Sequence, residues 1–100
     1  MYRLARSKNK WERRTAIVST AHFILKLKET AETFALAEIL LHDPDDTVNK
    51  ATGWMLRAAG DIDREAVLKF LEKHAAKISR AALRAAIEKL DKKTRDFYLK

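Results

Sequence analysis

The scarcity of glycine and proline limits what this chain can fold into. It has two glycines and one proline in 100 residues. Tight β-turns depend on these two residue types, so hairpins are disfavoured. Ala, Leu, Lys, Arg and Glu are abundant instead, and all five favour helix. The sequence therefore predicts an all-α fold.

The longest predicted helix runs over residues 10–28. Asn9 and Glu12 have the spacing of an N-terminal capping box. Two apolar stripes follow at helical spacing, which predicts a helix that packs on more than one side. One stripe holds Trp11, Thr15, Val18, His22 and Leu25, and the other holds Ile17, Ala21 and Ile24.

Capping residues divide the rest of the chain into further helices. Thr30 begins a helix with Phe34, Leu36, Ala37, Leu40 and Leu41 buried, and His42-Asp43-Pro44-Asp45-Asp46 ends it. The next helices are predicted over 47–59, from Asp63 to His74, from Ser79 to Leu90, and from Asp91 to the terminus. Gly60 occupies a position where the chain often turns left-handed. Residues 2–6 form the last turn of a helix or a short basic arm.

These segments predict one domain over residues 1–100. Short turns would join them as antiparallel pairs that recur about every 30–40 residues, the size of a HEAT-like repeat. We therefore expect a HEAT-like α-solenoid fragment of five to six antiparallel helices. A compact helical bundle is the alternative, because the pairs share little sequence.

The charge balance favours a nucleic-acid partner. The 21 basic and 14 acidic residues give a net charge of +7. Such an excess is typical of nucleic-acid binders, although it also serves solubility. There are no cysteines, no apolar run long enough to span a membrane and no secretory signal at the start. These features predict a cytoplasmic protein without a membrane partner.

No metal or cofactor is predicted. His22, His42 and His74 are too dispersed for a metal site. A partly buried, hydrogen-bonded role is the interpretation for His22.

Gly53 and Trp54 pose a question, because they adjoin each other inside a predicted helix. Glycine there costs about 1 kcal/mol relative to alanine. That cost is expected where another helix or a ligand approaches the backbone. Trp54 points about 100° away from Gly53, so the two residues do not share one contact. Lys50, Trp54 and Arg57 do share a face, which combines an aromatic ring with two cations.

Four segments resemble one family. SKNKWERRTAIVST, AEILLHDPDD, NKATGWMLRAAG and EKHAAKISRAALRAAIEKL are similar to the C-terminal half of bacterial DNA alkylation-repair proteins, the HEAT-like alkylpurine DNA glycosylases. The resemblance implies a curved solenoid whose basic concave face follows DNA, with a tryptophan and an arginine beside the damaged nucleotide. Trp54 matches that tryptophan and Arg14 that arginine. Arg13, Lys50 and Arg57 would be neighbouring basic groups.

The resemblance carries over no catalytic residue. The family's catalytic aspartate and a second lesion-facing tryptophan precede the matched region. Asp43, Asp45 and Asp46 are interpreted as turn and cap residues. We therefore expect a DNA-backbone-binding fragment that is not an enzyme by itself, with double-stranded DNA as its partner.

Two other functions stay open. The small residues Ala58, Ala59 and Ala85, where the family pattern is bulkier, are compatible with a truncated or engineered scaffold. Such a scaffold would bind a protein or a second copy of itself. A small-molecule pocket at these alanines is the third and weakest hypothesis.

Overall fold

The computed structural model describes residues 2–74, 76–88 and 90–99. These residues form seven α-helices and one π-helical segment, and they contain no strand, which confirms the all-α prediction. The helices are α1 (Tyr2–Ala5), α2 (Lys10–Ser19), α3 (Ala31–Ile39), α4 (Asp46–Ile62), α5 (Arg64–His74), α6 (Arg80–Ile87) and α7 (Lys92–Leu99), with the π-helical segment η1 (Phe23–Leu27) after α2. The predicted helical positions Lys89 and Lys100 lie outside the described residues.

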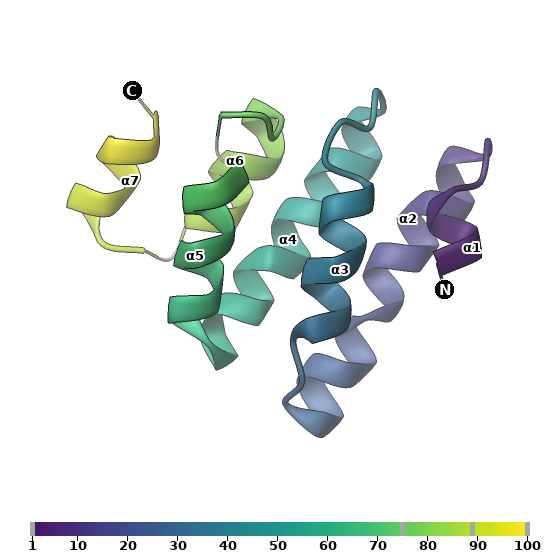
Figure 1. Cartoon of the computed structure of the whole chain (residues 1–100), viewed down its shortest axis with the longest axis horizontal. Helices are drawn as coiled ribbons and strands as arrows, with labels where there is room; N and C mark the ends of the chain where they lie inside the picture. Colours follow the sequence, from purple (N-terminus) through teal and green to yellow (C-terminus); the bar gives the residue numbers. More distant parts are fainter. Residues whose placement is uncertain (1, 75, 89, 100) are drawn as a thin grey trace.

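The helices form two layers. α2, α4 and α6 lie side by side in one layer, and α3 and α5 lie in front of it (Figure 1). α4 is central: it packs most extensively against α6, then against α2, and also contacts α3 and α5. α1 lies beside α2 at one end of the row, and α7 lies beyond α6 at the other.

The caps that the sequence predicts are present at most helix starts. The side chains of Asn9, Ser79 and Asp91 accept hydrogen bonds from backbone N–H groups two or three residues ahead. Asp63 does the same from the N–H of Ala66 at 3.1 Å. Thr30 precedes α3 as predicted, but its side chain makes no capping bond.

The helix predicted over residues 10–28 is interrupted, because α2 ends at Ser19 and helical structure resumes at residue 21 and continues through η1. Thr20 lies fully buried there, and its hydroxyl donates to the carbonyl of Ile17 at 2.7 Å. The Thr33 hydroxyl of α3 in turn donates to the Thr20 oxygen at 2.9 Å. Such back-bonding by a threonine competes with the regular helix ladder and bends it. The chain then continues through η1 and turns at Lys28, which has a φ of 56°.

α2 does pack on more than one side, since it contacts α1, α3 and α4, but the predicted stripe that begins at Trp11 is mostly exposed. Ile17 and Ile24 are buried, but the side chains of Trp11 and Leu25 are 58% and 69% exposed. His22, predicted to be partly buried, is exposed as well. The stripe that begins at Trp11 is therefore uncovered by the described residues except at Val18, which packs against the core.

Gly60 does not adopt the predicted left-handed conformation. α4 continues through it to Ile62, and the N–H of Asp63 bonds to the carbonyl of Ala59 at 2.8 Å. The turn falls at Asp63 instead, where the capping carboxylate of the next helix is available.

Gly53 marks a close approach between helices. It is buried, and a Cβ atom built on it would lie 2.6 Å from both the Ala82 carbonyl oxygen and Ala85 Cβ on α6. This answers the question raised by the sequence: a second helix, not a ligand, approaches the glycine. Ala59 is fully buried and Ala85 packs on Gly53, so these alanines serve helix packing rather than a pocket.

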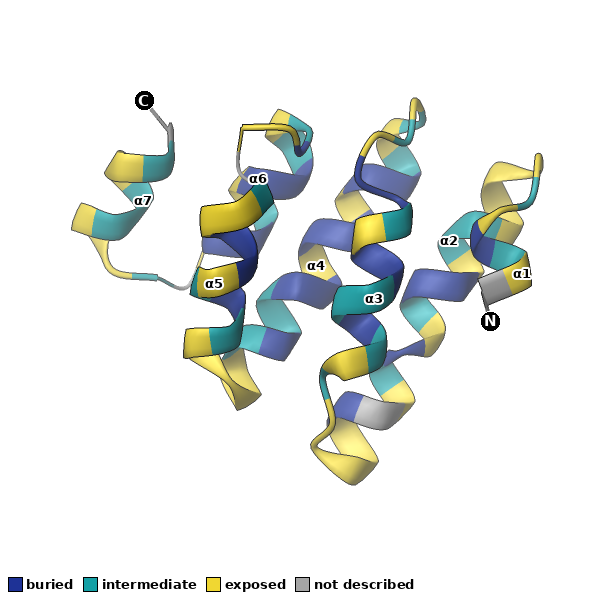
Figure 2. Ribbon diagram, in the orientation of Figure 1, coloured by how far each residue is buried: buried dark blue, intermediate teal, exposed yellow. Residues whose placement is uncertain are grey.

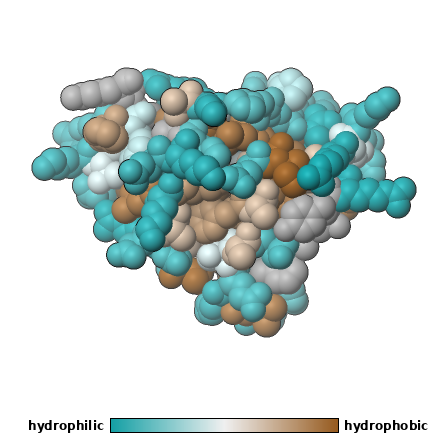
Figure 3. All heavy atoms as spheres, in the orientation of Figure 1, coloured by the Kyte–Doolittle hydropathy of each residue, from teal (hydrophilic) through white to brown (hydrophobic). Residues whose placement is uncertain are grey.

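The core lies between the two layers, where the buried positions of the helices face one another (Figure 2). The ring centroids of Phe34 and Phe70 lie 5.5 Å apart between α3 and α5. On the side of the molecule that α3 and α5 form, apolar side chains are visible among hydrophilic ones (Figure 3). Within the described residues, none of the helices has the length and apolar character to cross a bilayer.

Candidate nucleic-acid interface

The side of the α2–α4–α6 layer that points away from α3 and α5 is called the outer face here. On α4, Thr52 and Leu56 are fully buried against the rest of the molecule. Trp54 lies two positions from each, or about 200° around the helix, so it points to the opposite side. Its side chain is 48% exposed. Lys50 is exposed on the same face and Arg57 is half-buried there.

Arg14 lies where α2 meets α4. Lys10 Nζ is 3.6 Å from Asp45 Oδ2 at the N-cap of α4, so this side of α2 faces α4. Arg14 is one turn further along the same side of α2. It is half-buried, at roughly the level of Lys50 on α4. The structure thus brings Arg14 to the same face as Lys50 and Trp54.

Arg13 points to the interior. Its Nε lies 2.6 Å from Asp43 Oδ2, its Nη2 donates to Asp43 Oδ1 at 3.3 Å, and its Nη1 donates to the Ser7 carbonyl at 3.0 Å. The side chains of Arg13 and Asp43 are only 15% and 4% exposed. The hydrogen bonding of Arg13 to the Asp43 carboxylate raises the pKa of Arg13. Because all three of its guanidinium nitrogens are engaged, Arg13 ties α2 to the α3–α4 turn and is left out of the proposed interface.

Asp43 and Asp45 have the turn and cap roles that the sequence predicts. Asp43 accepts from Arg13 and from the N–H of Asp45. Asp45 accepts from the N–H groups of Thr47 and Val48 at 2.9 and 3.2 Å. Desolvation alone would raise the pKa of Asp45, but the Val48 hydrogen bond and the charge of Lys10 hold it below its ordinary value.

α6 adds charges to the outer face that the sequence interpretation missed. Ala82 and Ala86 are buried, whereas Arg84 and Glu88 are exposed on the opposite side of the helix. Glu88 Oε2 lies 2.6 Å from Arg57 Nη1 of α4, which places both groups on one surface. Arg84 is one turn before Glu88. Its spacing from Glu88 is visible in the sequence, but only the contact of Gly53 with α6 places it near Trp54.

The cations of the outer face differ in how they are paired. Arg57 is neutralised by Glu88. Arg14, Lys50 and Arg84 make no ion pair within the described ranges. Unpaired cations can bind phosphate groups, and an exposed indole among them can stack on a base. The described residues contain no group of His, Cys, Asp or Glu side chains that could hold a metal ion.

Fold and surface together define a layered helical protein with several cations and an exposed tryptophan on one face. The family model for "DNA alkylation repair enzyme" matches residues 1–90, and the chain belongs to this family. The match ends just before α7. Neither the curated proteins nor the solved structures contain a match to the chain.

Proposed function

We propose that this chain binds double-stranded DNA through the outer face of α2, α4 and α6. Arg14, Lys50 and Arg84 neutralise phosphate groups, and Trp54 lies against an exposed nucleotide. The chain corresponds to the C-terminal half of a HEAT-like alkylpurine DNA glycosylase and does not excise bases by itself. We place this DNA-binding role in the cytoplasm.

The observation that carries this proposal is the set of unpaired cations around Trp54. Arg14, Lys50 and Arg84 come from three neighbouring helices, and none forms an ion pair among the described residues. Unpaired like charges on one face repel one another and lower the stability of the folded chain. Binding of a polyanion removes this repulsion. A DNA backbone is such a polyanion, and releasing its counterions supplies much of the affinity.

The helix spacing supports a curved arrangement with the outer face inside. α4 and α6 approach so closely at Gly53 that no Cβ fits between them. α3 and α5, in the other layer, are held apart by two aromatic rings, Phe34 and Phe70. A row of helices that is narrower on one side curves toward that side. The proposed DNA would then lie in the concave side, as the family resemblance implies.

The absence of a catalytic role rests on how the acidic residues near this face are used. Asp43 is bound by Arg13, Asp45 caps α4, and Glu88 pairs with Arg57. Stabilising the cationic sugar left by a departing base requires a carboxylate available to the substrate. Each of these three carboxylates is engaged within the fold, whereas Asp46, in the first turn of α4, is exposed on the same face as Lys50.

The test is binding of a labelled DNA duplex at low and at moderate salt, measured by fluorescence anisotropy. We expect affinity that falls steeply with salt, because each neutralised phosphate adds about 0.9 to the slope of log K against log salt. Trp54→Ala should weaken binding about fivefold or more at both salt concentrations when the duplex carries one unpaired nucleotide, whose base is accessible to the indole. Lys69→Gln, which removes one exposed cation from α5 on the other layer, is the matched control. Salt-insensitive binding, or none at low salt, would refute the proposal.

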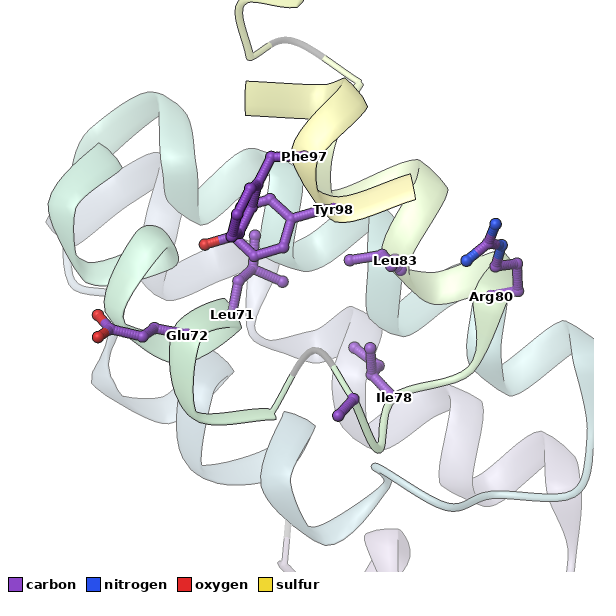
Figure 4. Close-up of a pocket in the computed structure, with 8 residues that line it drawn as sticks. Leu71, Glu72, Ile78, Arg80, Leu83, Phe97 and Tyr98 are labelled. Carbon is purple, nitrogen blue, oxygen red and sulfur yellow. The ribbon is translucent and has the colours of Figure 1, made fainter. Parts of the chain in front are cut away.

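A second candidate function is protein binding or self-association at the α7 end. Phe97 is 72% exposed on α7. Together with Tyr98 it overhangs a cavity of about 650 Å³ whose wall includes Leu71 of α5 and Leu83 of α6 (Figure 4). Light scattering tests this candidate, since a dimer that Phe97→Ser converts to a monomer would support it. A monomer at all concentrations would argue against self-association.

A further inference from the structure

The uncovered stripe of α2 carries a second exposed indole. Trp11 is 58% exposed, and it lies about 140° around α2 from Ala16, which is fully buried. Both tryptophans of the chain, Trp11 and Trp54, therefore point from the outer face into solvent. An intact duplex keeps the faces of its bases stacked inside and presents phosphates instead. Duplex binding alone thus leaves Trp11 without a use.

Two hydrogen bonds hold the backbone of Trp11 in place. The backbone N–H of Trp11 donates to the Asn9 side chain at 2.8 Å, and its backbone carbonyl accepts from the Thr15 hydroxyl at 2.8 Å. Lys10 Nζ lies 5.3 Å from the centroid of the ring and is also 3.6 Å from Asp45. The backbone at Trp11 is therefore fixed, and a cation covers part of the ring system.

The two indoles are arranged along one seam with cations between them. Because Lys10 lies level with Asp45, Trp11 lies about eight residues, or roughly 12 Å, before Trp54 along the helix axes. Arg14 and Lys50 lie between the two levels. Alternating aromatic rings and cations are what proteins use to bind a single strand, stacking on bases while neutralising the backbone.

We propose that Trp11 is a second stacking site that takes an unpaired nucleotide, so that the outer face favours DNA in which a duplex adjoins a single-stranded stretch. This inference rests on the proposed function, since it assigns the kind of DNA that the same face binds. Trp54 and the cations hold the duplex side, and the single strand continues along α2 to Trp11.

The presence of only two tryptophans makes the inference directly measurable. Trp54→Phe leaves Trp11 as the sole indole, and Trp11→Phe leaves Trp54. The probes are a duplex and a duplex of equal length with a gap of about ten nucleotides. We expect the gapped DNA to quench the emission of Trp11 strongly and the intact duplex to leave it unchanged. Trp11→Ala should weaken binding of the gapped DNA at least about fivefold and leave the intact duplex unaffected.

Lys69→Gln is the control, because Lys69 is an exposed residue of α5, on the other layer and away from α2. It should leave binding of both DNA probes unchanged. Circular dichroism of each variant tests whether it keeps its helix content. If Trp11→Ala unfolds the chain, the emission of Trp11 in the Trp54→Phe variant still decides the question.

The outcomes separate this inference from the proposed function. Salt-dependent binding of both probes with no change in Trp11 emission overturns the inference and leaves the duplex-binding proposal standing. Failure to bind either probe at low salt overturns both. A Trp11 emission that shifts with protein concentration alone would mean that a second copy covers the stripe, which also overturns the inference.

Discussion

The two sides of α2 use their positive charges in opposite ways. On the inner side, Arg13 is held by Asp43 and by the Ser7 carbonyl, with 15% of its side chain exposed. On the outer side Arg14, the next residue in the chain, makes no ion pair within the described part of the chain. A step of about 100° around the helix separates the two arginines.

This contrast shows that a cation's partner depends on the face of the helix it occupies. Inside, a carboxylate from the α3–α4 turn matches the charge of Arg13, so the guanidinium stabilises the fold. Outside, the charge of Arg14 is left for a ligand. The net charge of a whole chain therefore says little about ligand binding. It becomes informative once the cations paired within the fold are told apart from those left unpaired on the surface.

The largest effect is expected when the two arginines are replaced by alanine, one at a time. Arg13→Ala leaves Asp43, which is 4% exposed, without its cation. We expect a loss of about 3 kcal/mol in the free energy of unfolding, measured by urea denaturation. Arg14→Ala is the matched control and should change it by less than about 0.5 kcal/mol. Similar losses for both variants would contradict the division into two roles.

The contact between α4 and α6 gives the next largest effect. Gly53→Ala places a Cβ atom 2.6 Å from the Ala82 carbonyl oxygen, which can move only with its helix. Overpacking of about 3 kcal/mol, less about 1 kcal/mol of helix propensity, predicts a net loss of about 2 kcal/mol by thermal denaturation.

Gly60→Ala is the control, because its new Cβ would meet only the side chain of Val67, whose nearest atom is the Cγ2 methyl group at 3.3 Å. This change should be neutral or stabilise the chain by up to about 1 kcal/mol. A Gly53→Ala variant more stable than the parent would mean that α6 does not rest on α4 at this glycine.

Local chemistry predicted the helices and most of their starts. Side chains such as Asn9 and Asp45 cap a helix through bonds two or three residues away, so their roles are visible in the sequence alone. The end of α2 was not predictable in this way. It depends on the buried contact between Thr20 and Thr33, which lie 13 residues apart on different helices.

The candidate site was predictable where one helix supplies it. Lys50, Trp54 and Arg57 share a face of α4, as their spacing indicates. The role of Arg84 depends on α6 lying beside α4, which no spacing within α6 reveals. Likewise, the sequence alone does not show which of Arg13 and Arg14 is paired within the fold, because this depends on the position of Asp43 next to Arg13. Whether these residues bind DNA stays a prediction.

The unpaired cations give a smaller effect, on binding rather than on stability. Arg14→Gln and Arg84→Gln should each lower duplex affinity several-fold and reduce the salt slope by about 1. Glu88→Gln should have the opposite effect on affinity, because it frees Arg57 from its partner 2.6 Å away. These changes are measured by anisotropy titration at several salt concentrations. Equal affinities for all three variants would show that the outer face does not contact the backbone.

The smallest effect concerns the face farthest from the proposed DNA, where Glu38 of α3 bridges to α5. Its Oε1 lies 2.9 Å from His74 Nε2 and 3.5 Å from Lys73 Nζ. The hydrogen bond with His74, followed by the charge of Lys73, lowers the pKa of Glu38 below its ordinary value of 4.5. A carboxyl group whose pKa is lower in the folded state stabilises the fold above its unfolded pKa, and this contribution is lost as the pH falls through the folded pKa.

Glu38→Gln should therefore cost about 0.5 kcal/mol near neutral pH and nothing at a pH well below 4. Urea denaturation at the two pH values measures the difference. Glu72→Gln on α5 is the control, since Glu72 makes no ion pair among the described residues and should show a smaller difference. If Glu38→Gln cost as much in acid as at neutral pH, the bridge between α3 and α5 would depend on packing rather than on charge. In that case the ion pair of Arg13 with Asp43 would stabilise the fold through charge, and the contact of Glu38 with α5 would not.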